Sequence, residues 1–170
     1  MLIYILLIAV ILFLLFLLSM IWPPDSPWAP WWRTNSKTAK AICKLAKINK
    51  KDIVCDLGCG DGEVLIQAVK LGAKGVGIEI DPLRYFVAKL RFLKNNLSKE
   101  IIIKRDNFFN QDISNATVII VYLVPKTLDR LLPKFKKELK KGTRIVSFRY
   151  KINMPLRSFD KKNNIRLYII

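Results

Sequence analysis

Three glycines spaced two residues apart follow a short apolar segment, in the order Asp56-Leu57-Gly58-Cys59-Gly60-Asp61-Gly62. Glycine has no Cβ and adopts positive φ without strain, so such a turn lets a ligand lie directly against the backbone. The apolar residues between Val64 and Val69 have helical spacing, and the first turn of a helix offers N–H groups that lack an internal partner. We therefore expect a strand, a glycine turn and a helix that together bind a ligand.

The charges beside this turn indicate what kind of ligand it binds. Dinucleotides are bound by G-x-G-x-x-G, whereas the glycines here have the spacing G-x-G-x-G. Asp56 precedes the first glycine and Asp61 lies inside the turn, and carboxylates repel a pyrophosphate but attract a sulfonium or an amino group. The phosphate loop G-x-x-x-x-G-K-[ST] is absent from the sequence. The turn is therefore predicted to bind a cationic ligand.

A further carboxylate lies at the end of the next apolar segment. Gly75 to Ile80 reads as a strand with Glu79 near its end, and Pro82 is expected to open a helix. Glu79 lies nineteen residues after Gly60, close to the interval of about 20 at which a strand-end acid binds a ribose diol. A glutamate at such a place can also be merely solvated, but its combination with the glycine turn favours a ligand that contains a ribose.

These two segments resemble the class I (seven-β-strand) S-adenosylmethionine-dependent methyltransferases. Asp56–Gly62 stands where the first motif of that class stands, and Gly77–Pro82 stands where the second does. Residues 106–109, 122–125 and 139–147 are more narrowly similar to the protein-lysine methyltransferases of archaea and their membrane-anchored relatives. Among those relatives are the mitochondrial enzymes that methylate the c-type ring protein of ATP synthase and the adenine nucleotide translocase.

The resemblance, which covers roughly residues 29–150, implies S-adenosylmethionine as the cofactor and a protein lysine as the methyl acceptor. It implies Tyr122 and Pro125 as catalytic residues, with no metal and no residue that must act as a general base. By the same resemblance, Asp106 contacts the adenine or its neighbourhood. The residues implied to bind the cofactor are Asp56, Gly58, Cys59, Gly60, Gly62, Glu79, Ile80, Asp106 and Asn107.

Short apolar strands alternate with helical segments, which predicts an α/β, Rossmann-like fold with a mostly parallel sheet. Asp56, Glu79, Asp106 and Tyr122 are each expected at the carboxyl end of a strand, where ligands bind in such sheets. About twenty residues remain after the fifth strand for an antiparallel hairpin that closes the sheet. The expected helices are 36–48 (capped by Ser36), 62–71, 82–96 and 125–141 (with a second helix starting at Pro133), and the expected strands are 52–57, 74–80, 101–103, 117–122, 144–148 and 165–170.

The chain is predicted to have three parts: an anchor (1–22), a linker (23–35) and a methyltransferase domain (36–170). Residues 1–22 carry no charge and are apolar for long enough to form a transmembrane helix. A cleaved signal peptide fits less well, because there is no basic start and no A-x-A-like cleavage site. The linker is rich in proline and tryptophan, as is typical of a membrane interface. All lysines and arginines follow the anchor, which predicts a single-pass membrane protein with a cytoplasmic domain and an outside N-terminus.

The composition narrows the partners and the chemistry. With 30 Lys and Arg against 13 Asp and Glu, the chain has a formal charge of +17. The basic residues show no nucleic-acid-binding signature, so an anionic lipid surface explains the charge more simply, and an acidic substrate stays open. The three cysteines match no zinc pattern, and the absence of histidine excludes mechanisms that require one. A lipid or isoprenoid acceptor and an RNA acceptor remain alternatives to a protein lysine.

Overall fold

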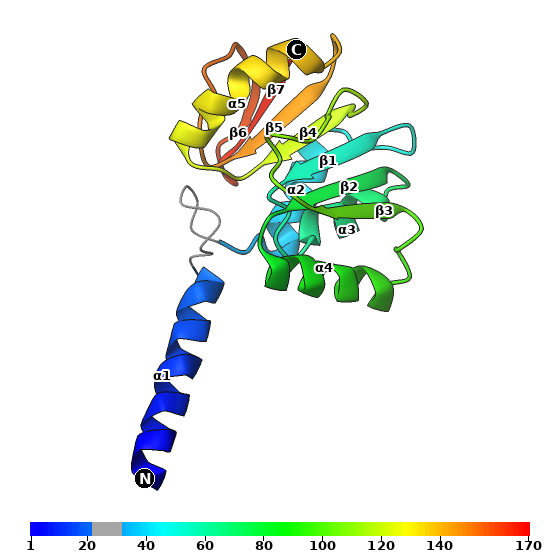
Figure 1. Ribbon diagram of the computed structural model, residues 1–170. Coiled ribbons are helices and arrows are strands. Elements are labelled where there is room, and N and C mark those ends of the chain that lie inside the picture. Colours follow the sequence, from blue (N-terminus) through cyan, green and yellow to red (C-terminus); the bar gives the residue numbers. More distant parts are fainter. Residues whose placement is uncertain (22–31) are drawn as a thin grey trace.

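The computed structural model describes residues 1–21 and 32–170, and most of the second range forms one seven-stranded sheet (Figure 1). The strands are β1 (Ile53–Leu57), β2 (Lys74–Glu79), β3 (Ile101–Arg105), β4 (Val118–Val121), β5 (Arg144–Phe148), β6 (Leu156–Asp160) and β7 (Ile165–Ile169). Their spatial order is β3-β2-β1-β4-β5-β7-β6, and β1 to β5 are mutually parallel. The predicted Rossmann-like, mostly parallel sheet is confirmed.

The centre of the sheet consists of apolar residues because both of its faces are covered. All four residues of β4 are buried, and β4 pairs with β1 on one side and with β5 on the other. Successive side chains of a strand point to opposite faces, so a run of apolar residues serves two cores at once. The reversal of strand order between β1 and β4 opens a crevice at the carboxyl ends, which is where sheets of this type bind ligands.

Helices cover the two faces unequally (Figure 1). On one face lie α2 (Ser36–Leu45), α3 (Glu63–Val69) and α4 (Pro82–Lys94), and on the other lies α5 (Pro125–Glu138). The first core packs Ile42, Leu65 and Phe92 from the helices against Val54, Val118 and Ile120 of the strands. The second packs Leu128, Leu131 and Phe135 of α5 against Leu57, Ile119 and Ile145. Burial of these side chains supplies the main driving force for folding.

The short C-terminal segment closes the sheet as an antiparallel pair. β7 inserts between β5 and β6 and runs antiparallel to both. A turn at Asp160 connects β6 to β7, where the Asp160 carboxylate accepts a hydrogen bond from the backbone N–H of Asn163 at 3.0 Å. The fully buried hydroxyl of Tyr168 accepts a hydrogen bond from the N–H of Ile152 at 3.0 Å. Five residues in each strand are therefore enough to complete the fold.

Two expectations about helices were wrong. The N-cap of α2 is Asn35, whose Oδ1 accepts a hydrogen bond from the N–H of Thr38 at 2.9 Å; Ser36 is already helical. Pro133 starts no second helix, because α5 runs unbroken through it. Neither Pro133 nor Asp129, the residue one turn earlier, is buried, so the hydrogen bond that the proline removes lies on the solvent side of the helix.

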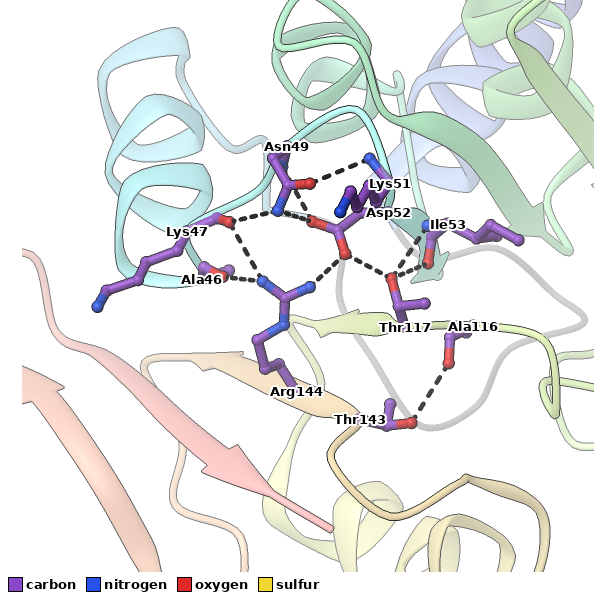
Figure 2. Close-up of polar contacts among 10 residues, drawn as sticks. All are labelled: Ala46, Lys47, Asn49, Lys51, Asp52, Ile53, Ala116, Thr117, Thr143 and Arg144. Atoms are coloured by element: carbon purple, nitrogen blue, oxygen red, sulfur yellow. Dashed lines mark hydrogen bonds and ion pairs between the residues drawn. The ribbon is translucent and has the colours of Figure 1, made fainter.

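A polar network ties the amino ends of three strands together, at the edge of the sheet remote from the crevice (Figure 2). The buried carboxylate of Asp52 pairs with the Arg144 guanidinium and accepts a hydrogen bond from the Thr117 hydroxyl at 2.8 Å. Asn49 donates to the same carboxylate from its backbone N–H at 2.9 Å. Arg144 also donates to the carbonyl oxygen of Ala46 at 2.5 Å, just after α2. The network thereby joins segments that are almost 100 residues apart in sequence.

The N-terminal segment forms α1 (Leu2–Ile21). Its large apolar side chains up to Leu17 are all exposed, and Leu17 itself is 41% exposed. Within the described residues, we find no helix that combines the length and the apolarity required to cross a membrane. Most of the linker expected at 23–35, including Trp28 and Trp31, lies outside the described residues.

Candidate active site

A pocket opens at the carboxyl ends of β1, β2 and β4, where the sequence analysis expected a site. Its walls come from the glycine turn after β1, the end of β2, the loop after β3 and the residues that follow β4. The residues lining it that the sequence analysis had singled out are Asp56, Gly58, Cys59, Gly60, Glu79, Ile80, Asn107 and Tyr122. Segments that are distant in sequence thus meet at one edge of the sheet.

The glycine turn has a backbone conformation that other residues adopt only with strain. Gly58, Gly60 and Gly62 have φ values of +81°, +55° and +75°. The N–H groups of Gly58 and Cys59 both donate to the carbonyl oxygen of Ile78, at 2.8 and 3.1 Å, which fastens the turn to β2. A Cβ on Gly58 would contact only Leu123, at 3.6 Å, so the backbone of the turn lies open to the pocket.

Gly62 has a structural task rather than a place in the pocket wall. It is the N-cap of α3, and a Cβ added to it would lie 2.3 Å from the ring of Phe92. The third glycine of the motif is therefore required because α4 packs directly against the turn.

Glu79 holds the two halves of the motif together. Its Oε2 accepts a hydrogen bond from the N–H of Gly60 at 2.8 Å, and its Oε1 accepts one from the N–H of Asp81 at 3.0 Å. The side chain is almost completely buried, and this burial raises the pKa of the carboxyl, although the two backbone donors oppose the rise. Each carboxylate oxygen keeps a lone pair that can accept a further hydrogen bond from a ligand hydroxyl.

Asp56 is the most perturbed acid of the site. Burial raises the pKa of its carboxyl to about 8, and the negative charges of Glu79 and Asp61 add to the rise. A group with this pKa is largely protonated at neutral pH in the protein alone. A cation that enters the pocket would favour the ionised carboxylate and would lower the pKa.

Asp61 and Glu63 are held by arginines from outside the motif. Asp61 Oδ2 lies 2.7 Å from Arg33 Nε and 2.7 Å from Arg91 Nη1, and Glu63 Oε2 lies 2.5 Å from Arg91 Nη2. Burial acts to raise the pKa of Glu63, but hydrogen bonds from Arg91 and Gln67 outweigh it, and the pKa is lowered. These pairs neutralise two of the acids near the turn, whereas no positive charge contributes to the pKa of Asp56.

An aromatic corner, formed by Tyr122, Phe148 and Tyr150, borders the pocket. The Tyr122 and Phe148 rings meet edge to face at 4.5 Å between centroids, and the Tyr122 and Tyr150 rings stack at 6.4 Å. The guanidinium of Arg149 lies 5.6 Å from the ring centroids of both Tyr122 and Phe148. The corner already contacts a cation in this structure, through the cation–π interaction that aromatic faces offer.

Three residues that the sequence analysis had singled out do not line the pocket: Gly62, Asp106 and Pro125. Asp106 uses its carboxylate inside the loop, accepting hydrogen bonds from the N–H of Asn107 and the side chain of Gln111 at 2.6 Å each. Pro125 is the first residue of α5. Wall residues that the analysis had not assigned to the site are Trp32, Thr34, Ile42, Asp61, Glu63, Val64, Arg84, Phe108, Phe109, Ile120, Leu123, Thr127, Arg130 and Phe148.

The unassigned wall residues carried little local signal. Trp32 and Phe148 reach the pocket from opposite ends of the domain, so no motif spacing connects them with the glycine turn. Phe108 and Phe109 directly follow Asp106-Asn107, and their place next to a strand-end motif was the one available indication.

The donor set of the pocket fits S-adenosylmethionine, which combines cationic groups, a ribose and an adenine. Two buried acids, Asp56 and Glu79, face a wall of open glycine backbone. Carboxylates attract a sulfonium and an amino group, and a strand-end acid with free lone pairs suits a ribose diol. Apolar side chains such as Ile80 and Phe108 provide surface for a planar base.

Comparison with known proteins identifies the family. The profile of the ANTKMT methyltransferase domain matches residues 56–155. A protein-lysine N-methyltransferase of Saccharolobus islandicus is 40% identical over 131 residues, which cover 76% of this chain and 80% of that protein. A lysine N-methyltransferase of Caenorhabditis elegans, named for the C-type component of ATP synthase, is 27% identical over 116 residues, 68% of this chain. The match spans only 60% of the nematode protein.

The fold agrees with solved structures of the same class. An RNA methyltransferase from Salinibacter ruber, crystallised with S-adenosyl-L-homocysteine, superposes with a TM-score of 0.76 at 28% identity. The superposition covers 82% of this chain and 94% of the other. The chain therefore belongs to the ANTKMT methyltransferase domain family and is a class I, S-adenosylmethionine-dependent methyltransferase.

Proposed function

We propose that this protein transfers methyl groups to the side-chain amine of lysine residues in a protein substrate. The archaeal relative at 40% identity is a protein-lysine N-methyltransferase, and the nematode relative is likewise named a lysine N-methyltransferase. The observation that carries the proposal is the aromatic corner beside the pocket, since its rings contact a guanidinium in this structure and offer the same faces to an ammonium.

The cofactor is held, in this proposal, by the residues of the glycine turn and the strand ends. Asp56 attracts the cationic end, Glu79 accepts hydrogen bonds from the ribose hydroxyls, and Ile80 with Asn107 borders the adenine. Bound S-adenosylmethionine supplies a methyl group on a sulfonium, which an uncharged amine can displace. Asp106 and Gly62 support the site from behind, by shaping the loop after β3 and the start of α3.

The acceptor amine has to lose its proton before it can react. A lysine has a pKa of about 10.4, so the uncharged form costs about 4–5 kcal/mol at pH 7. Burial of the amine among aromatic rings and a nearby positive charge both favour the uncharged form. Tyr122 and Phe148 provide the rings and Arg149 the charge, with Pro125 shaping the wall behind Tyr122. The domain thereby prepares the acceptor without a general base.

We also propose that α1 holds the catalytic domain at a membrane as a single-pass anchor with an outside N-terminus. The support is the uncharged sequence of residues 1–22 and the helix Leu2–Ile21, whose 20 residues are about 30 Å long at 1.5 Å per residue. All 30 basic residues follow the anchor and none precedes it, which favours a cytoplasmic domain. If this is right, the protein stays in the membrane pellet after alkaline carbonate extraction, and a chain starting at Trp32 does not.

An RNA acceptor is the second candidate. The observations that favour it are the +17 charge and the 28% identity with the Salinibacter ruber RNA methyltransferase. Binding to RNA through backbone phosphates would weaken steeply with salt. A lipid or isoprenoid acceptor is supported only by the proposed location at a membrane.

The test is transfer of radioactive methyl from S-adenosylmethionine into membrane, soluble protein, RNA and lipid fractions, with wild type beside Glu79→Ala. We expect a labelled protein band that the variant fails to produce, and hydrolysis of that band should yield methyl-lysine. Glu100→Ala is the matched control, because Glu100 is exposed and does not line the pocket. Label in RNA or in the organic extract would reject the lysine proposal in favour of the corresponding alternative.

A further inference from the structure

Helix α4 presents large apolar side chains on its outer side as well as on its inner side. Phe86, Val87, Leu90 and Leu93, called here the α4 stripe, are 55%, 38%, 49% and 64% exposed. Their spacing places them along one side of the helix. The opposite side, with Ala88 and Phe92, is buried in the first core. A helix that is apolar on both sides is normally covered on both, so the α4 stripe lacks a partner among the described residues.

The charges around the α4 stripe are all positive. The sequence of α4 contains Arg84, Lys89, Arg91 and Lys94 and no acidic residue. Arg91 is used by its ion pairs with Asp61 and Glu63. Lys89 and Lys94 are exposed and border the stripe. Leucine and phenylalanine framed by lysines are the composition with which helices lie in the interface of an anionic bilayer.

The inner side of the same helix contacts the active site. α4 starts at Pro82, three residues after Glu79, and Arg84 lines the pocket. Arg91 pairs with Asp61 in the glycine turn. Figure 1 shows α4 at the outer margin of the helical layer, with no described strand or helix of the catalytic domain packed over its outer side. A surface that holds the outer side of α4 would therefore hold the pocket at a fixed distance from that surface.

We propose that the α4 stripe docks the catalytic domain onto the surface of an anionic phospholipid bilayer, with Lys89 and Lys94 at the headgroups. The proposal rests on the proposed function in one respect, namely that α1 keeps the domain beside a membrane. Docking orients the pocket toward acceptor lysines close to the bilayer surface. The occupant is the lipid surface, since positive charge beside the stripe disfavours the pairing of two such stripes from two copies of the chain.

The experiment uses the full chain with a single environment-sensitive fluorophore at Leu90→Cys. Leu156→Cys, on β6, is a matched control because Leu90 and Leu156 are both leucines and both 49% exposed. The native cysteines are buried, and burial raises the pKa of the Cys43 and Cys55 thiols to about 12 and that of Cys59 well above its ordinary value, so they react slowly. The labelled proteins are mixed with vesicles of phosphatidylcholine alone or with phosphatidylserine, each containing a quencher-labelled lipid.

We expect quenching of the Leu90→Cys label in phosphatidylserine vesicles to exceed that of the Leu156→Cys label at least about two-fold. The excess should shrink in neutral vesicles and at high salt, because lysines contribute to the docking. Equal quenching at the two positions would overturn the proposal. So would a change at Leu90→Cys that needs no vesicles and grows with protein concentration, which would assign the stripe to a second copy.

Cosedimentation of the same samples separates this proposal from the anchor. If the protein sediments with vesicles and the two labels behave alike, α1 binds lipid and only the docking of α4 is wrong. If the protein stays in solution, both the anchor and the docking are wrong. A second variant, Leu90→Glu/Leu93→Glu, should lower methylation of a membrane-embedded acceptor several-fold while the Kd for the cofactor stays unchanged.

Discussion

Asp56 shows how one buried carboxyl can couple pH, stability and binding. Its pKa of about 8 in the folded protein lies far above the value of about 3.9 for an unfolded chain. Between these two values the folded state binds the proton more tightly than the unfolded state does. The free energy of unfolding contributed by this group is therefore greatest at low pH and falls as the pH rises towards 8.

Replacement of Asp56 by asparagine should remove that dependence. We expect wild type without cofactor to lose more than about 1 kcal/mol of stability between pH 6 and pH 9 from this group, since each unit of pKa shift corresponds to about 1.4 kcal/mol. Asp56→Asn should lose correspondingly less, as measured by urea unfolding at both pH values. Parallel declines in the two proteins would show that Asp56 ionises normally.

The same group should release a proton when a cation binds. Calorimetric titration of S-adenosylmethionine at pH 7, repeated in buffers of different ionisation enthalpy, measures that proton. A fraction of a proton per molecule bound is expected for wild type, and less for Asp56→Asn. Equal proton release by the two proteins would assign the proton to another group.

At the scale of elements, the glycine turn and α4 depend on each other. Gly62 and Gly142 both have positive φ, +75° and +90°, but only Gly62 has a neighbour that a Cβ would strike, the Phe92 ring at 2.3 Å. Gly142→Ala should cost about 1 kcal/mol for its backbone conformation alone. Gly62→Ala should cost roughly 2–4 kcal/mol, because the ring has to move as well. Urea unfolding of both variants gives the comparison, and equal costs would mean that Phe92 yields freely.

The same scale shows what the sequence could predict. The five parallel strands were foreseen within a few residues because each is a short apolar run followed by a polar or glycine residue, as in Val54-Cys55-Asp56. The cap of α2 was misplaced by one residue because Asn35 and Ser36 are both good capping residues, and only the backbone angles decide between them. Pro133 misled because its effect depends on which side of the helix faces water.

The candidate site was predictable where the motif itself forms the wall. Eight of the residues named from sequence line the pocket, since they lie in strand ends and turns whose direction the fold dictates. The arginines that hold Asp61 were not predictable, because Arg33 and Arg91 come from 28 and 30 residues away, and no spacing announces them. The aromatic corner around Phe148 was missed for the same reason.

At the scale of the whole molecule, the amino ends of the strands are held by the Asp52 network (Figure 2). Arg144→Leu would leave the buried Asp52 carboxylate without its cation and free the carbonyl of Ala46. We expect a loss of about 3–5 kcal/mol in the free energy of unfolding. Lys134→Ala, which breaks an ion pair between neighbouring turns of α5, should cost less than about 1 kcal/mol and serves as the control. Similar losses in thermal or urea unfolding would contradict this ranking.

The ion pair between Arg33 and Asp61 has a consequence for the range over which the enzyme works. Eleven residue steps separate Ile21, the last residue of α1, from Trp32, and a fully extended chain of that length spans at most about 40 Å. The pair fastens the far end of that span to the glycine turn, so the span ends at the pocket itself rather than at a remote part of the domain. With α1 in a bilayer, the enzyme would act as a molecular ruler: it could reach lysines up to a set height above the lipid and none beyond it.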